Sequence, residues 1–111
     1  MKSGKNFSVV LVTAPDLKTA RSLAKAAIAG RLAACVNVVP GIESHYRWKG
    51  RIESAGEVLM VMKTMQGCLG ALEKMILEKH PYETAEFIVL PLQSGSKRYL
   101  EWMDECCKRV E

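Results

Sequence analysis

Two long, strand-like runs of residues, Ala33–Trp48 and Ile52–Thr64, flank the short segment Lys49–Gly50. Side chains alternate along the first run, which places Tyr46 and Trp48 on one face. A tight turn at Lys49–Gly50 would join the runs into a hairpin much longer than strands of about five or six residues. A chain of 111 residues cannot cover both faces and both edges of such a hairpin. We therefore expect the hairpin to project beyond its own domain and to pair with another molecule.

A proline and a glycine, Pro40 and Gly41, interrupt the first of these runs. Proline lacks the backbone N–H that a strand ladder needs, and it is therefore found at bulges and sheet edges. We expect a β-bulge or bend here, which would re-aim the strand beyond it. Tyr46 and Trp48 lie beyond this bend, and we expect them near a neighbouring subunit.

The composition, with 49% hydrophobic and 25% charged residues, predicts one ordinary globular domain over residues 1–111. The net charge of +4 comes from basic residues scattered among acids, so nucleic-acid binding is disfavoured. No apolar run approaches the roughly 20 residues of a membrane span, and we expect a cytoplasmic protein without a membrane partner. The polar end segments, residues 1–6 and 108–111, are expected to be flexible.

Apolar periodicity divides the chain into four strands and three helices, in the order β-α-β-β-α-β-α. Besides the hairpin, these elements are a strand over Phe7–Thr13, a helix between Asp16 and Gly30, a helix over Gln66–Lys79, a strand over Glu86–Leu92 and a helix after Ser96. Two right-handed βα units joined by the hairpin give an antiparallel sheet with both of their helices on one face. We therefore predict an α+β fold of the ferredoxin-like βαββαβ type, with a projecting hairpin and a C-terminal helix.

Several element ends carry chemical signals of their own. Asp16 can accept a hydrogen bond from a free N–H of the first helix, and Gly30 suits the left-handed conformation that ends many helices. His80 precedes a proline, which disfavours continuation of the second helix. Gln93–Gly95 is expected to form a turn. The last helix is expected to dock through Tyr99, Leu100 and Met103.

The strand predicted over Phe7–Thr13 is nearly all apolar, which is typical of a central strand buried on both faces. The return strand of the hairpin is apolar on both faces as well. Helices cover only one face of a ferredoxin-like sheet, so the other face would be an exposed apolar patch. Such patches usually mark interaction surfaces, and we therefore expect self-association.

The segment His80–Glu86 places an imidazole, a phenol and carboxylates within seven residues, between a helix and an edge strand. Loops on a rigid scaffold often carry binding groups, and His80, Glu83 and Glu86 are candidate metal ligands. The alternative is a stiff, proline-containing turn in which His80 binds carbonyl groups at the helix end. Cys35 is either a small core residue or a thiolate ligand for a soft metal such as Cu(I).

Five further side chains combine aromatic rings with charge and could line an amphipathic pocket between subunits: Tyr46, Trp48, Lys63, Tyr82 and Trp102. The same residues could simply fill an interface, where aromatic residues are enriched. The sequence contains no nucleophile–base pair, phosphate-binding glycine loop or paired zinc motif, and no aromatic pattern of the RNA-binding type. We therefore expect no enzymatic activity.

Six phrases follow one another along the chain: Thr13-Ala14-Pro15-Asp16, Leu32-Ala33-Ala34-Cys35-Val36-Asn37, Ser44-x-Tyr46-x-Trp48, Glu57 with Lys63-Thr64, His80-Pro81-Tyr82-Glu83 and Tyr99-Leu100-x-Trp102. Together they resemble the CutA family of divalent-cation tolerance proteins, from Val9 to Trp102 and without an evident gap. The resemblance implies a ferredoxin-like fold, an architecture like that of the PII signalling proteins, and a homotrimer held by strand pairing between subunits. The hairpin residues expected at this interface are Pro40, Gly41, Tyr46 and Trp48.

The resemblance also implies a role in tolerance of copper and other divalent cations, without an established enzymatic activity. Some bacterial members carry a Cys just before Thr-Ala-Pro and a double His before Pro-Tyr, where this chain has Val12 and Lys79–His80. Only His80 remains of that set, so a Cys/His/His copper site is not supported. Ala85 stands where the family commonly has proline, which loosens the turn before Glu86.

Two functional hypotheses follow. The first is a homotrimeric, cytoplasmic protein of the copper-tolerance type that binds metal through His80, with Glu83, Glu86 or Cys35 as helpers. The second is a PII-like signalling or adaptor protein that binds a small anionic ligand in the cleft between subunits. An acylphosphatase-like hydrolase is disfavoured, because residues 14–16 lack the arginine that its phosphate-binding loop needs.

Overall fold

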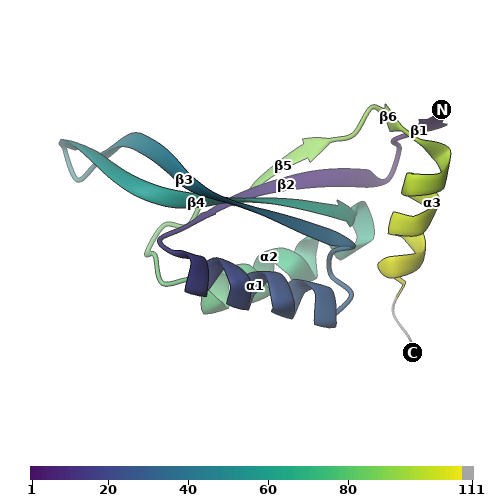
Figure 1. Ribbon diagram of the computed structural model, residues 1–111, viewed down its shortest axis with the longest axis horizontal. Helices are drawn as coiled ribbons and strands as arrows, with labels where there is room; N and C mark the ends of the chain where they lie inside the picture. The colour runs from purple at the N-terminus through teal and green to yellow at the C-terminus, as the bar shows by residue number, and fades with distance from the viewer. Residues whose placement is uncertain (109–111) are drawn as a thin grey trace.

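The computed structural model describes residues 1–108, which form a four-stranded antiparallel sheet, a two-stranded sheet and three α-helices (Figure 1). The larger sheet has the order β3-β4-β2-β5, with β2 at Phe7–Ala14, β3 at Cys35–Trp48, β4 at Arg51–Met65 and β5 at Ile88–Pro91. The helices are α1 at Leu17–Ala29, α2 at Leu69–Lys79, preceded by a 3₁₀ turn at Gln66–Cys68, and α3 at Lys97–Cys106. This is the predicted ferredoxin-like arrangement with β2 and β4 as its central strands.

The main core lies between the sheet and helices α1 and α2, which cover one sheet face (Figure 1). Its largest buried side chains come from both central strands and both helices: Val10, Val12, Leu23, Met60, Met62, Leu72 and Ile76. Burying a side chain of this size contributes about 1.5–3 kcal/mol, so this core fixes the strands firmly on the helices. α1 begins as predicted, because the Asp16 carboxylate accepts a hydrogen bond of 2.7 Å from the Thr19 N–H.

Helices α1 and α2 leave the opposite face of the sheet bare, and α3 covers only its end near Phe7 (Figure 1). The sequence predicted β2 to be buried on both faces, and this is wrong for a single chain. Its side chains that face α1 and α2 are buried, and Phe7 at its start is buried in the cluster at α3, whereas Val9 and Leu11 on the open face are partly exposed. On the flanking strands Val39, Ile88 and Leu90 are 42%, 47% and 43% exposed. This apolar surface has the character of an interaction face.

The β3–β4 hairpin extends beyond the helices at one end of the molecule (Figure 1). Lys49 and Gly50 join its strands with φ values of 49° and 79°, the left-handed pair that a type I′ turn requires. The strand register shifts between Val39 and Ile42, which confirms the predicted bulge. Gly41 at this bulge has a φ of 78°, a conformation that glycine adopts without steric cost.

The bulge adds one residue to β3 and thereby changes which of its side chains share a face with β4. Before the bulge, odd-numbered residues are paired with odd-numbered ones, as Cys35 with Lys63; beyond it, Tyr46 is paired with Glu53. Directly opposed residues of an antiparallel pair lie on the same face. The side chains of Tyr46 and Trp48 therefore point to the same side as the open, apolar face of the sheet.

The expectation for Gly30 is wrong. Gly30 has a φ of −83°, and the following Arg31 takes the left-handed conformation with a φ of 56°. Two hydrogen bonds fix this arrangement, from the Arg31 N–H to the Ile28 carbonyl and from the Leu32 N–H to the Ala27 carbonyl. This is the Schellman pattern, shifted by one residue from the glycine.

Two short segments differ from the sequence prediction as well. Lys2–Ser3 forms β1 and pairs with β6 at Ser94–Gly95, where we expected a loose segment and a turn. The nearby Gly4 N–H donates to the Gln93 carbonyl at 2.7 Å, so long-range backbone bonds order both segments. β5 is an edge strand as predicted but covers four residues instead of Glu86–Leu92. The predicted flexible C-terminus lies, from residue 109 onward, outside the described residues.

Helix α3 packs against the far end of the sheet through a second, smaller cluster of buried side chains. Its N-terminus is capped as predicted by Ser96, whose hydroxyl accepts from the Tyr99 N–H at 3.4 Å. Leu100 and Met103 are buried as predicted, but Tyr99 is 42% exposed and stays on the surface. Burial raises the pKa of Cys107 in this cluster to about 11, with the neighbouring Cys68 contributing.

Candidate functional site

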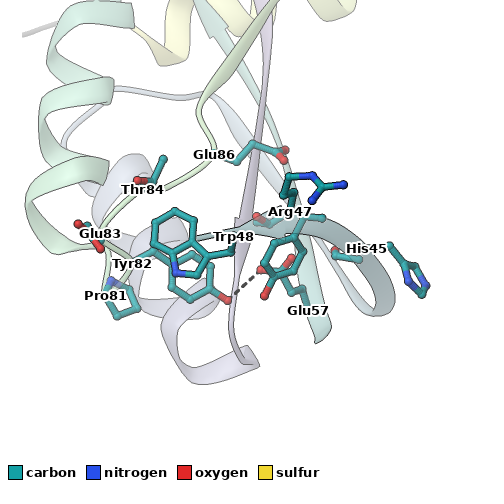
Figure 2. A pocket seen from close by; sticks show the side chains of 12 residues that line it. His45, Arg47, Trp48, Glu57, Pro81, Tyr82, Glu83, Thr84 and Glu86 are labelled. Carbon is teal, nitrogen blue, oxygen red and sulfur yellow. Dashed lines mark hydrogen bonds between the residues drawn. The ribbon is translucent and has the colours of Figure 1, made fainter. Parts of the chain in front are cut away.

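A pocket of about 780 Å³ opens between the hairpin and the segment that follows α2. The hairpin contributes residues 44–48 and Glu57, β2 contributes Thr13, and five residues between Pro81 and Glu86 complete the lining (Figure 2). The bulge in β3 places Tyr46 and Trp48 on the face that carries Glu57. The pocket therefore depends on the strand register that the bulge sets.

Glu57 is the most buried acidic residue of the pocket, with 9% of its surface exposed. Its Oε2 accepts a hydrogen bond of 2.8 Å from the Tyr82 hydroxyl, drawn as the dashed line in Figure 2. Burial, together with this bond to the carboxylate, raises the pKa of Tyr82 to about 12. The phenol therefore remains protonated at neutral pH and serves as a permanent donor to Glu57.

A second carboxylate, Glu86, lies close enough to Glu57 to be affected by its charge. Burial raises the pKa of Glu86 above its ordinary range, and the negative charge of Glu57 raises it further. Two carboxylates in a partly buried site repel each other because both are negative. A positive charge placed between them relieves this repulsion and is therefore stabilised there. The pair therefore forms an electronegative centre in the pocket.

The rim of the pocket carries charged groups that are largely in solvent. The Lys49 ammonium lies 5.6 Å from the centre of the Trp48 ring and 3.9 Å from Oε2 of Glu83. His45 bonds to Glu43 at 2.9 Å, and Figure 2 shows its ring directed away from the other lining side chains. These exposed contacts contribute little to stability, because solvent screens them.

His80 is 7% exposed, and both of its ring nitrogens are engaged. Nδ1 accepts from the Tyr82 N–H at 3.1 Å, so the proton is on Nε2, which donates to the Thr13 carbonyl at 2.7 Å. The tautomer is thus assigned from its partners. His80 fastens the segment after α2 to β2, close to the alternative we predicted, although the acceptor belongs to a strand instead of the helix end.

The predicted metal ligands His80, Glu83, Glu86 and Cys35 do not form a metal site in the single chain. Both ring nitrogens of His80 already have hydrogen-bond partners. Cys35 lies on β3, paired with Lys63 of β4, and is away from the segment that carries the other three residues. Cys35 is also only half-buried, so it is not a core residue either. Within residues 1–108, no three His, Cys, Asp or Glu side chains gather as metal ligands do. These residues do not fit a copper ion.

The five residues predicted to line a ligand cleft are divided between two places. Tyr46, Trp48 and Tyr82 line the pocket of the single chain, and the cleft between subunits stays a prediction. Lys63 instead donates to the Asn37 side chain on the open sheet face. Trp102 lies on α3, where its ring centre is 5.3 Å from that of Tyr99. Only an arrangement of several chains could bring these two sets together.

Sequence reasoning missed the central role of Glu57 and the contribution of Thr13 to the pocket. In the sequence, Glu57 looks only like the charged end of an apolar strand segment. A signal was present, since a single acid directly before a long apolar stretch is unusual in a central strand. Thr13 carries no such signal, because its carbonyl, not its side chain, holds His80.

Comparison with known proteins decides the family. The family model described as CutA1 divalent ion tolerance protein matches residues 8–106. The chain belongs to the CutA1 family. A divalent-cation tolerance protein CutA from Thermus thermophilus is 42% identical over 97 residues, which cover 87% of this chain and 94% of that protein. Mouse protein CutA is 45% identical over 105 residues, or 95% of this chain, but this chain spans only 59% of the mouse protein.

Solved CutA1-family structures share the fold throughout. The Thermus thermophilus structure superimposes with a TM-score of 0.90 at 40% identity, covering 92% of this chain and 99% of that one. A structure of a protein from Archaeoglobus fulgidus, named a periplasmic divalent cation tolerance protein, gives 0.89 at 34% identity and covers 92% and 99%. These comparisons confirm the ferredoxin-like, PII-like CutA1 fold. The names of these relatives describe no enzymatic activity, and its absence here stays a prediction.

No helix in residues 1–108 is both long enough and apolar enough to span a membrane. The Archaeoglobus protein carries the periplasm in its name, so CutA1-family proteins are not confined by name to one compartment. The cytoplasmic location that we expected from the sequence therefore stays a prediction.

Proposed function

We propose that this CutA1-family chain acts as a cytoplasmic homotrimer in tolerance of divalent cations, copper among them. The observation that supports this most strongly is the hairpin, which extends beyond the helices while the adjoining sheet face lies bare (Figure 1). Exposed strand edges and large apolar faces promote association, and natural proteins rarely leave both open. A trimer in which each hairpin pairs with a neighbour would cover both.

The assembly can be tested by light scattering coupled to size-exclusion chromatography. We expect a mass of about three times the 12.3 kDa of one chain. Deleting residues 43–54, with a two-residue Asn-Gly turn in their place, should give monomers or aggregates. The matched control is Lys49→Asn, which suits the type I′ turn and keeps the full hairpin. An intact trimer after the deletion would show that the assembly is held elsewhere.

The part of the proposal that concerns copper does not use a site built from His80, Glu83, Glu86 and Cys35. Their geometry in the single chain offers no ligand set within residues 1–108. We therefore propose that metal binding uses side chains of more than one subunit. Titration of Cu(II) into the full-length hairpin protein and into the deletion variant tests this, since binding by an intersubunit site is lost together with the trimer.

A second candidate function is that of a PII-like sensor or adaptor with its ligand in the pocket. The observation that favours it is the pocket itself, assembled from a hairpin, a central strand and the segment after α2, around the buried Glu57. A thermal-shift screen of metabolites separates the two functions. Stabilisation by an organic ligand without an effect of metal supports the sensor, and the reverse result supports the metal role.

A further inference from the structure

We propose that the pocket binds a small organic cation, an alkylammonium or guanidinium compound, with its charge beside Glu57 and Glu86 and its apolar part against the aromatic rings. The inference deepens the ligand-binding role proposed above and rests on it. It also reverses the sign of the ligand charge that the sequence suggested.

The charges lining the pocket are predominantly negative. Three carboxylates line it, those of Glu57, Glu83 and Glu86. Of its two basic lining residues, His45 is bonded to Glu43 and its ring points away, which leaves Arg47, while Lys49 at the rim is paired with Glu83. A small anion would meet two or more carboxylates within the same cavity. Repulsion in a partly desolvated site is strong, so an anionic ligand is disfavoured there.

Glu57 provides an independent reason to expect a cation. The residue is about nine-tenths buried, yet no lysine, arginine or histidine nitrogen of residues 1–108 lies within 4.0 Å of its carboxylate. Its side-chain partner is the neutral Tyr82 hydroxyl. Buried carboxylates are normally paired with a positive group, since desolvation of an unpaired charge is expensive. A cationic ligand would supply the missing partner.

The aromatic wall suits the organic part of such a ligand. Trp48, Tyr46 and Tyr82 line the pocket together with the carboxylates. Ammonium and guanidinium groups are attracted to aromatic faces, most strongly to tryptophan. The chain already shows this preference at the rim, where the Lys49 ammonium lies over Trp48 and beside Glu83.

The size of the pocket favours an organic cation over a bare metal ion as its ligand. A volume of about 780 Å³ is in the range of small-molecule sites and far exceeds the space that one ion needs. The described residues also place no three potential ligands around one point. An organic cation fills the cavity and uses both the acids and the rings.

Trp48 provides a direct reporter of occupancy. Because Trp48 and Trp102 are the two tryptophans of the chain, Trp102→Phe leaves Trp48 as the sole source of tryptophan fluorescence. Trp102 lies on α3, outside the pocket. In this background, n-butylammonium chloride and butylguanidinium chloride are titrated at constant ionic strength. Sodium butyrate serves as the anionic counterpart, and calcium chloride as the metal ion.

We expect a saturable change in Trp48 fluorescence with the two organic cations and none with butyrate. Glu57→Gln keeps an acceptor for the Tyr82 hydroxyl but removes the charge, and it should weaken binding at least tenfold. Glu86→Gln is the second variant and should weaken binding in the same direction. Glu73→Gln, an exposed acid on α2 outside the pocket, is the matched control and should bind as the parent does.

Tighter binding of butyrate, saturation by calcium alone, or no response to either organic cation overturns the proposal. The proposal is also overturned if the Glu57→Gln and Glu86→Gln variants bind the organic cations as tightly as the parent does, with the fold intact by circular dichroism. Light scattering during the titration identifies the source of the cation. If the organic cation dissociates the oligomer, a basic side chain of a second copy occupies the site, and the proposal of a free ligand is wrong. If the protein is not a trimer but still binds the organic cations, only the proposed trimer is contradicted.

Discussion

Glu57 shows how much of this site depends on one residue and its surroundings. It lies directly before the apolar stretch of β4, and the fold buries it beneath Tyr82 instead of leaving it in solvent. From there it influences the hydroxyl of Tyr82 and the carboxyl group of Glu86. A single charged residue thus sets the electrostatic character of the whole pocket.

The pKa of Glu86 gives a prediction with a defined sign. Its folded-state pKa lies above the value of about 4.3 expected in the unfolded chain, so the folded state binds the proton more tightly. The contribution of Glu86 to stability is therefore present at low pH and is lost as the pH rises through its folded-state pKa. In Glu57→Gln the Glu86 pKa should fall, but burial, the larger cause, should keep it above the ordinary value. Carboxyl ¹³C NMR titration measures this, and an unchanged pKa would contradict the coupling.

His80→Ala tests whether the imidazole is structural. The variant leaves the Thr13 carbonyl and the Tyr82 N–H without their partner, which should lower the free energy of unfolding by about 1–3 kcal/mol. Affinity for Cu(II) should not change, because both ring nitrogens are already engaged. Urea denaturation and calorimetric titration measure the two effects. His45→Ala, at an exposed position, is the control, and a tenfold loss of copper affinity in His80→Ala alone would restore the metal hypothesis.

At the scale of elements, predictability follows the range of the interactions. The hairpin, its turn, its bulge and the Asp16 cap were predictable because each rests on signals within a few residues. The pairing of β1 with β6 was not, since Lys2–Ser3 and Ser94–Gly95 meet only once the chain is folded. Local pattern likewise identified Tyr46, Trp48 and Tyr82 as pocket residues, but it could not show that Lys63 and Trp102 lie elsewhere.

Replacing two glycines by alanine should change the free energy of unfolding in opposite directions, because one lies in a turn and the other in a helix. Gly50→Ala should lower the free energy of unfolding by roughly 1–2 kcal/mol, because its φ of 79° is unfavourable for a residue with a Cβ. Gly70→Ala should raise it by about 0.5–1 kcal/mol, since a Cβ there meets no atom within 4 Å and alanine favours a helix. Thermal and urea unfolding of both variants measure the difference. Equal effects would show that the turn at Lys49–Gly50 does not require its left-handed backbone.

At the scale of the whole molecule, the bare sheet face is the feature that one chain leaves unresolved. The helices lie on the other side, and α3 reaches only the end of the sheet (Figure 1). The fold of the single chain thus accounts for its core but not for its apolar surface. Association of several chains is the simplest arrangement that accounts for both.

Two exposed leucines distinguish a solvent-facing surface from an interface. Leu90 on β5 and Leu77 on α2 are similarly exposed in the single chain, at 43% and 47%. Leu90→Asp should dissociate the trimer, because a buried carboxylate at the interface would be unpaired. Leu77→Asp, on the helical side, should leave the mass unchanged. Light scattering of both variants measures this, and a trimer that tolerates Leu90→Asp would place the interface elsewhere.

The extra residue at the bulge in β3 makes the hairpin sensitive to the parity of insertions and deletions. Removing one residue at Pro40 or Gly41 would turn Tyr46 and Trp48 to the opposite face, although every residue of the tip would remain. Removing two residues from each strand between the bulge and the turn would shorten the hairpin without exchanging its faces. Among homologues of differing hairpin length, changes in this region should therefore come in even numbers on each strand, wherever the aromatic side chains keep their place in the pocket.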